Sequence, residues 1–281
     1  MTSMGTGKTI VPALLVAGLL AACSPSSTPP QASAPANGTA PASTAPAASA
    51  PPAQAALADV AESDPRYVIG ISYPPQINQY PGLAKAVGDY AGAARQGLME
   101  AVKDLGQEKP TAPYELSLAF DMVANTPEVV AVSGNGSRYT GGAHGEPLVA
   151  RFTWLPQRQT LLTTQSLLTQ GKGLEAVSGY VREQLHTAAS LRNDDPGMSP
   201  EDRASLLQSA TQMIDEGTAP KLENFSLFQP VMNADGKITA LRFVFPPYQV
   251  GPYSDGTQTV DVPAQVLAPY LAPEDAGLFV K

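Results

Sequence analysis

A histidine followed closely by a glutamate is the first pair of side chains in this sequence that could do acid–base chemistry. His144 and Glu146 lie in the glycine-rich run 139–146, and a histidine oriented by a carboxylate is a common general base. The other parts of a hydrolase are missing: there is no Gly-x-Ser-x-Gly elbow, and His186 is not at metal-ligand spacing from His144. We therefore expect no enzyme activity, no catalytic residues, no metal and no cofactor. A hydrolase that uses His144 and Glu146 is the alternative.

A second stretch, 246–256, concentrates proline, tyrosine and glycine. Tyr248, Pro252 and Tyr253 lie in it. Tyrosines on a loop that proline stiffens offer a large contact area at a small cost in conformational entropy, which suits recognition of a partner. The alternative is a well-packed connection in which the tyrosines are buried.

The first 22 residues have the layout of an export signal. Lys8 supplies a positive charge, residues 10–22 form a short uncharged apolar run, and Leu-Ala-Ala-Cys ends it at Cys23. The run is too short to span a bilayer with a margin. The ending resembles the bacterial lipobox, which implies a signal peptide over 1–22 and lipid on Cys23. An ordinary signal peptide is the alternative. Cys23 is the only cysteine, so no disulfide can form within the chain.

The next stretch, 23–58, is expected to be a disordered tether, with the folded part starting near Leu57. It has no charged residue and is made mainly of proline, alanine, serine and threonine, a composition that cannot bury enough apolar surface to fold. The chain has a net charge of −8, which argues against nucleic acid as a partner. Ser24 after the lipidated cysteine fits an outer-membrane anchor facing the periplasm.

The apolar patterns predict an α+β fold with helices packed on one face of antiparallel sheets. We expect an N-terminal unit over 59–155 and a C-terminal unit over 156–281. The first contains strands at 67–73, 114–122, 128–133 and 148–154, a helix at 82–105 and a tight turn at Asn135-Gly136. The second contains helices at 173–189 and 200–215, a hairpin of 225–232 and 237–245 across Asp235-Gly236, a strand at 257–262 and a helical turn at 264–270.

Two motifs carry a family resemblance. Tyr139-Thr140-Gly141-Gly142-Ala143-His144-Gly145, followed by Tyr248-Gln249-Val250-Gly251-Pro252-Tyr253-x-x-Gly256, resembles the extracytoplasmic domain shared by the anti-sigma factor RsiV and the peptidoglycan deacetylase PdaC. The resemblance covers about 62–271. It implies a binding module, which in RsiV is a receptor for lysozyme. Because the segments for sigma-factor binding and deacetylation are not found, we expect neither activity here.

These observations predict a lipid-anchored, non-catalytic and monomeric protein of the cell envelope. We expect the protein to be attached to the membrane through lipid on Cys23. We expect its ligand to be a lysozyme-like muramidase or peptidoglycan. The alternatives are the hydrolase above and a structural outer-membrane lipoprotein. The expected binding residues are Tyr139, His144, Tyr248, Pro252 and Tyr253.

Overall fold

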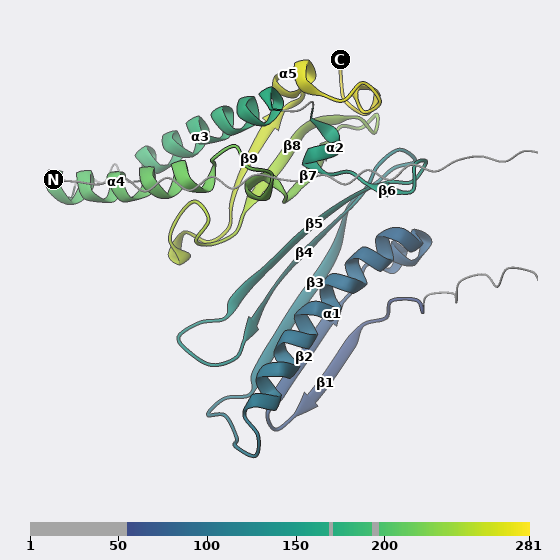
Figure 1. Ribbon diagram of the computed structural model, residues 1–281, viewed down its shortest axis with the longest axis vertical. Helices are drawn as coiled ribbons and strands as arrows, with labels where there is room; N and C mark the ends of the chain where they lie inside the picture. The colour runs from purple at the N-terminus through teal and green to yellow at the C-terminus, as the bar shows by residue number, and fades with distance from the viewer. Residues whose placement is uncertain (1–54, 169–170, 193–196) are drawn as a thin grey trace, which may run out of the picture. The chain divides into compact units, whose positions relative to one another are not determined.

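Two β-sheets, each with helices packed on it, form the described part of the chain: residues 55–168, 171–192 and 197–281 of the computed structural model (Figure 1). The predicted α+β class is confirmed. The predicted signal peptide, Cys23 and the tether as far as residue 54 lie outside the described residues. Within the three described ranges, no helix has the length and apolar character needed to cross a membrane.

The first sheet has six strands that lie side by side in sequence order. β2 and β3 are parallel, whereas every other neighbouring pair is antiparallel. This one departure from antiparallel pairing follows from helix α1 (Pro81–Asp104), which carries the chain back to the starting end of the sheet. The strands are β1 (Val60–Asp64), β2 (Tyr67–Ser72), β3 (Tyr114–Asn125), β4 (Val130–Tyr139), β5 (Glu146–Leu155) and β6 (Thr160–Leu161).

Helix α1 covers one face of this sheet (Figure 1). It follows a short 3-10 helix, η1 (Pro75–Gln79), and buries the predicted stripe of residues at three- and four-residue steps against alternate residues of β3. The sequence does not predict β1, which contains two acidic residues, but β1 pairs with β2 along its whole length. Just before β1, the backbone of Leu57 exchanges two hydrogen bonds with the Asn78 side chain.

The predicted tight turn at Asn135-Gly136 is wrong. Both residues lie inside β4, where Asn135 is opposite Ala119 and Gly136 is opposite Leu118. The glycine is needed for a different reason: a Cβ atom on Gly136 would lie 2.0 Å from the backbone oxygen of Ser117. The β3–β4 connection is instead at residues 126–129, where Thr126 hydrogen-bonds to the backbone of Val129. The chain turns from β4 into β5 at residues 140–145.

The second sheet has three antiparallel strands, β7 (Phe228–Met232), β8 (Ile238–Phe245) and β9 (Gln258–Pro263). The predicted hairpin at Asp235-Gly236 is confirmed, and Gly236 has the positive φ of 75° that favours glycine in a tight turn. Phe225, Phe243 and Phe245 form the centre of its core with edge-to-face contacts. Short helices flank the sheet: α2 (Thr164–Leu167), η2 (Leu222–Phe225), η3 (Tyr253–Asp255), α5 (Ala264–Leu267), η4 (Ala268–Tyr270) and η5 (Ala276–Leu278).

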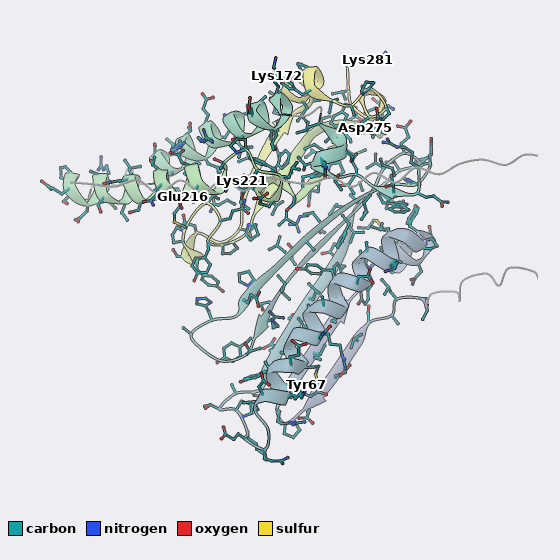
Figure 2. All side chains as sticks on the ribbon, viewed as in Figure 1. Tyr67, Lys172, Glu216, Lys221, Asp275 and Lys281 are labelled. Carbon is teal, nitrogen blue, oxygen red and sulfur yellow. The ribbon has the colours of Figure 1, made fainter. Side chains whose placement is uncertain are left out.

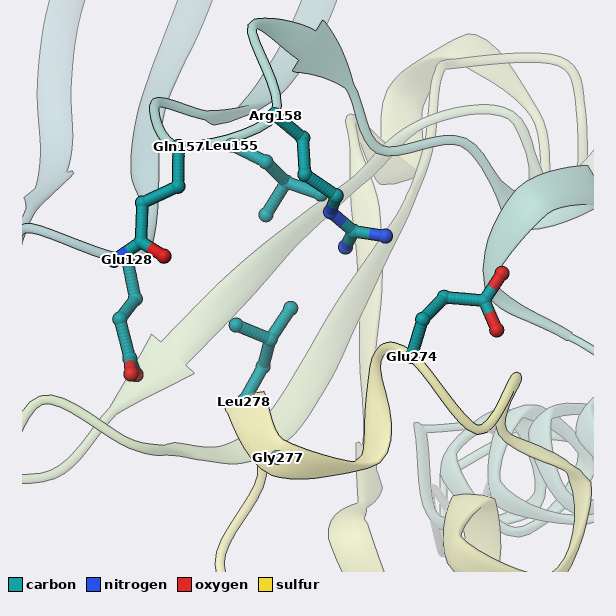
Figure 3. Close-up of a pocket in the computed structure, with 7 residues that line it drawn as sticks. All are labelled: Glu128, Leu155, Gln157, Arg158, Glu274, Gly277 and Leu278. Carbon is teal, nitrogen blue, oxygen red and sulfur yellow. The ribbon is translucent and has the colours of Figure 1, made fainter.

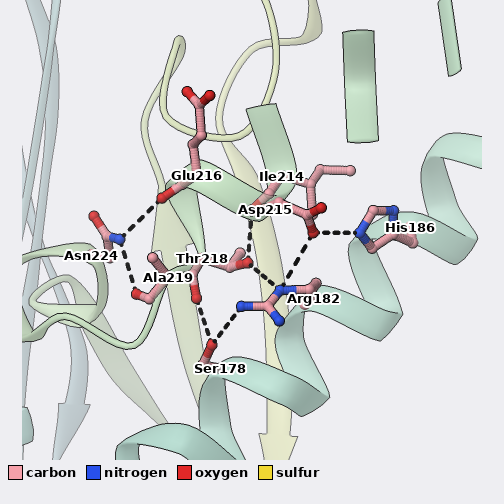
Figure 4. A network of polar contacts seen from close by, with 9 residues as sticks. All are labelled: Ser178, Arg182, His186, Ile214, Asp215, Glu216, Thr218, Ala219 and Asn224. Atoms are coloured by element: carbon pink, nitrogen blue, oxygen red, sulfur yellow. Dashed lines mark hydrogen bonds and ion pairs between the residues drawn. The ribbon is translucent and has the colours of Figure 1, made fainter. Parts of the chain in front are cut away.

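Two long helices, α3 (Lys172–Arg192) and α4 (Pro200–Gly217), pack against each other beside this sheet. Ser199 caps the start of α4: its hydroxyl accepts a hydrogen bond from the backbone N–H of Asp202 at 3.1 Å. Near the other end of α4, the Asp215 carboxylate lies 3.0 Å from His186 Nε2 and 3.5 Å from Arg182 Nε (Figure 4). His186 of α3 therefore helps to hold α3 against α4. Residues 193–196, between α3 and α4, lie outside the described residues.

Hydrogen bonds hold the C-terminal segment after η4 against both sheets. Asp275 (Figure 2) is 1% exposed and its carboxylate accepts a hydrogen bond from Arg158, which follows β5. The backbone N–H of Val280 donates to the oxygen of Ile238 in β8 at 3.0 Å. Lys237 Nζ joins Glu128, which precedes β4, to the carbonyl of Gly277. All described residues belong to one compact unit, so these contacts lie within it.

Candidate functional site

The turn between β4 and β5 brings His144 to the surface. Gly141 and Gly142 have φ angles of 99° and 96°, a backbone conformation that a residue with a Cβ atom rarely adopts. Tyr139, at the end of β4, donates a hydrogen bond from its hydroxyl to the carbonyl of Gly142 at 3.2 Å. Tyr139 therefore fixes the path of the turn, and His144 extends from the segment that follows.

The loop between β8 and β9 presents the two tyrosines. Tyr248 has a φ of 73°, which is unusual for a residue other than glycine, and its backbone N–H donates to the carbonyl of Gly251 at 2.9 Å. The side-chain amide of Gln249 donates to the backbone oxygens of Gly217 and Asn224. A Cβ atom on Gly217 would lie 1.9 Å from the oxygen of Gln249, so the loop lies directly against the end of α4.

His144, Tyr248 and Tyr253 meet in one cluster, which we call the aromatic cluster. Tyr253 stacks on the imidazole of His144, with ring centroids 4.1 Å apart and planes at 17°. The hydroxyl of Tyr248 is 3.0 Å from His144 Nε2, and the two tyrosine rings are 5.7 Å apart. Tyr248 is 55% exposed and Tyr253 is 37% exposed. The alternative of a connection with buried tyrosines is therefore wrong.

The charged side chains near the cluster are already paired. Asp255, two residues after Tyr253, forms an ion pair with Arg192 at the end of α3 at 3.3 Å. The carboxylate of Glu146 accepts a hydrogen bond from Arg138 Nε at 3.1 Å. Within the described chain, no hydrogen bond joins Glu146 to His144, whose Nδ1 is 3.2 Å from the oxygen of Gly145. The pairing that the hydrolase alternative requires is thus not formed.

Three of the five predicted binding residues form the cluster, and the other two, Tyr139 and Pro252, shape the turns that carry it. Pro252 is exposed and caps η3, the turn that carries Tyr253, while Tyr139 acts through the β4–β5 turn. Gln249 and Gly217 hold the loop in place and were not among the predicted binding residues. Gln249 stands inside the tyrosine-rich motif, but nothing in the sequence links it to Gly217.

Four hollows in the described part of the surface have none of the five predicted binding residues in their lining. One of about 260 Å³ lies between the turn after β5 and the C-terminal segment, and its lining includes Glu128, Arg158 and Glu274 (Figure 3). In the described residues, no group of three or more His, Cys, Asp or Glu side chains could hold a metal ion. The aromatic cluster is accordingly the candidate site, and its exposed aromatic rings suit binding by surface contact.

Comparison with known proteins matches the two halves of the site to two family models. A family model described as "Deacetylase PdaC" matches residues 60–146, which include His144, and one described as "Protein of unknown function (DUF3298)" matches 165–265, which include both tyrosines. Over these two regions the chain is similar to the shared PdaC/DUF3298 family, which is associated with the cell envelope. In this chain, the aromatic cluster joins a residue of the first matched region to two of the second.

The chain is also similar to a curated protein and to solved structures of the DUF3298 family. The peptidoglycan-N-acetylmuramic acid deacetylase PdaC of Bacillus subtilis is 25% identical over 198 residues, which are 70% of this chain and 37% of the relative. The chain thus spans little more than a third of that protein's length. A DUF3298-family crystal structure from Pseudomonas aeruginosa shares the fold, with a TM-score of 0.51, 15% identity and coverage of 80% and 96% of the two chains. One from Bacteroides fragilis has a TM-score of 0.49 and 16% identity, over 79% and 94%.

Proposed function

We propose that this chain is a non-catalytic binding protein of the cell envelope that recognises a lysozyme-like muramidase through the aromatic cluster. It is a monomer, held by lipid on Cys23 at the outer membrane and facing the periplasm. The observation that carries the proposal is the exposure of Tyr248 and Tyr253 around His144. Aromatic side chains of this kind dominate the binding energy of many protein interfaces.

Three further features support a protein ligand of positive charge. The chain has a net charge of −8, which favours association with a cationic partner such as lysozyme. The loop carrying the tyrosines is held at its base by Gln249 and by the Asp255–Arg192 ion pair, so little entropy is lost when it binds. The resemblance to the RsiV domain points to the same ligand.

Single substitutions in the aromatic cluster test the proposal. The dissociation constant for a c-type lysozyme is measured on an immobilised surface for Tyr253→Ala, His144→Ala and the wild-type chain. Loss of a central aromatic anchor should weaken binding by about ten-fold or more. Leu206→Ala, which removes an exposed apolar side chain from α4, is the control and should bind like the wild type. Equal binding by all four proteins would show that the cluster is not the contact surface.

Peptidoglycan is the second candidate ligand, and the name of the Bacillus subtilis relative favours it. Sedimentation with purified cell-wall sacculi separates the two candidates. One outcome is that the chain sediments with sacculi and shows no binding to lysozyme. If Tyr253→Ala then stops the sedimentation, the cluster is the binding site for the polysaccharide. Release of labelled fragments from the sacculi that stops in His144→Ala would instead establish the hydrolase alternative.

A further inference from the structure

A hollow of about 400 Å³ beside the start of α1 has a composition that the aromatic cluster does not explain. No charged side chain lines it. Its lining brings together two aromatic rings, two amides and two prolines: Tyr80, Trp154, Gln79, Gln159, Pro81 and Pro156. The volume lies within the range of small-ligand sites in proteins.

Three other hollows of the described surface have charged side chains in their lining. The one in Figure 3 has Arg158 and Glu274, a second has Arg242 and Asp261, and a third has Arg138 and Glu146 in its lining. A neutral lining offers no electrostatic attraction to an ion or a charged peptide. It leaves apolar contact and hydrogen bonding as the means of recognition.

The walls of this hollow are held in place. The Tyr80 hydroxyl is 2.7 Å from Asn125 Oδ1 at the end of β3, which fixes the ring. Trp154 is 8% exposed and packs against Gly82, where a Cβ atom would lie 2.3 Å from the indole ring. A site whose aromatic walls are already ordered loses little entropy when a ligand binds.

Gln159 ends the turn between β5 and β6 and lines the hollow. It has a φ of 50°, in the region where glycine is favoured, and its side chain is exposed at the edge of the hollow. A glycine here would relieve the backbone strain. The side-chain amides of Gln159 and Gln79 both line the hollow, and each can donate and accept hydrogen bonds.

We propose that this hollow binds a neutral N-acetylated saccharide unit, such as one sugar of a glycan strand. The C–H face of a pyranose ring is complementary to the negative face of an aromatic ring, and its hydroxyl and acetamido groups both donate and accept hydrogen bonds, as the two glutamines do. A proline-rich peptide fits less well, because it offers mainly carbonyl acceptors. The inference concerns a different site from the aromatic cluster, and its saccharide ligand belongs to the same class as peptidoglycan, the second candidate ligand named above.

Trp154 is the only tryptophan of the chain, so its fluorescence reports on this hollow alone. The mature chain carrying Cys23→Ser is titrated with an uncharged oligomer of N-acetylglucosamine up to about 10 mM. The wild-type site should give a saturable change in emission. Gln159→Gly should raise the dissociation constant about five-fold, the effect of one hydrogen bond, and it relaxes the backbone, so it should fold at least as well. Gln157→Ala, on the same turn but lining the hollow of Figure 3, should bind like the wild type.

Other outcomes would overturn the inference. No saturable change at the highest saccharide concentration would exclude the site, as would equal weakening by Gln157→Ala. A saturable response to a proline-rich peptide with none to the saccharide would assign the hollow to a different ligand. The outcome is independent of the proposed function: Tyr253→Ala should keep the saccharide response, and Gln159→Gly should keep lysozyme binding.

Discussion

Tyr248 combines backbone strain with surface exposure. Its φ of 73° would suit glycine better, yet the residue places a hydroxyl 3.0 Å from His144 Nε2. Strain of this kind is found at functional positions, where the surrounding structure sustains it. The Tyr248 side chain is more than half exposed, so its contribution to stability is small. We infer that binding, and not folding, is the reason for a tyrosine at this position.

Tyr248→Gly separates these two contributions. Glycine relieves the strain but makes the unfolded chain more flexible, so the free energy of unfolding should stay within about 1 kcal/mol of the wild type. Binding of lysozyme should weaken by about ten-fold or more. Urea unfolding and a binding titration on the same sample measure both effects. A large loss of stability with unchanged affinity would show that Tyr248 is structural.

Tyr90 of α1 makes stability depend on alkaline pH. Burial raises the pKa of its phenol above the ordinary value of 10.0, and Glu146 adds to the shift, although Arg138 and Arg151 oppose it. As the pH rises above about 10, the unfolded chain releases this proton before the folded chain does, so the free energy of unfolding falls.

Tyr90→Phe should flatten that decline, because the ring keeps its edge-to-face contacts with Phe120 and Phe152 while the ionisable group is gone. The free energy of unfolding in urea, measured between pH 8 and pH 11, checks this. Burial also raises the pKa of Tyr73, so part of the slope should remain until Tyr73→Phe is added. An unchanged slope in the double variant would contradict the assignment.

Strands β3 and β4 approach each other so closely at one point that only glycine fits. Gly136→Ala would place a methyl group 2.0 Å from the oxygen of Ser117, so the free energy of unfolding should fall by about 3 kcal/mol, the upper part of the range for overpacking. Gly70→Ala in β2 is the control, since no atom lies within 4 Å of the added group. Chemical denaturation of both variants measures the difference. Similar stabilities would mean that the two strands separate at little cost.

Strands β3 and β4 also show which helices and strands can be located from the sequence and which cannot. Alternation along 114–122 and the helical stripe after residue 82 identified β3 and α1 closely, because each pattern reflects burial on one face. Asn135-Gly136 has the composition of a tight turn, but pairing on both sides of β4 overrides this local preference. β1 has no apolar pattern of its own and is recognised only from its partner strand.

At the scale of the whole molecule, the site joins residues 104 positions apart in the sequence. The two motifs were identifiable from their composition and from family resemblance. Their meeting was not, because it depends on how the turn after β4 and the loop after β8 are placed in the fold. The hollow beside Trp154 was not predicted either, since its lining comes from two separate segments with no shared motif.

The net charge of −8 makes a prediction at this same scale. An acidic chain and a cationic lysozyme attract each other over long distances, and dissolved salt screens this attraction. Their association should therefore slow as the ionic strength rises. Between about 0.05 and 0.5 M salt, we expect the association rate to fall at least ten-fold, with a smaller change in the dissociation rate. Surface plasmon resonance measures both rates. A salt-independent association rate would show that net charge does not guide the encounter.

The most direct test of the central claim is calorimetric titration of the mature chain, carrying Cys23→Ser, with a c-type lysozyme at near-physiological salt. The substitution removes only the thiol that lipid would occupy. We predict saturable one-to-one binding that weakens at least ten-fold in Tyr253→Ala. No heat of binding at lysozyme concentrations of about 100 μM, well above the dissociation constants of most specific complexes, would contradict the proposal that this protein recognises a lysozyme-like muramidase.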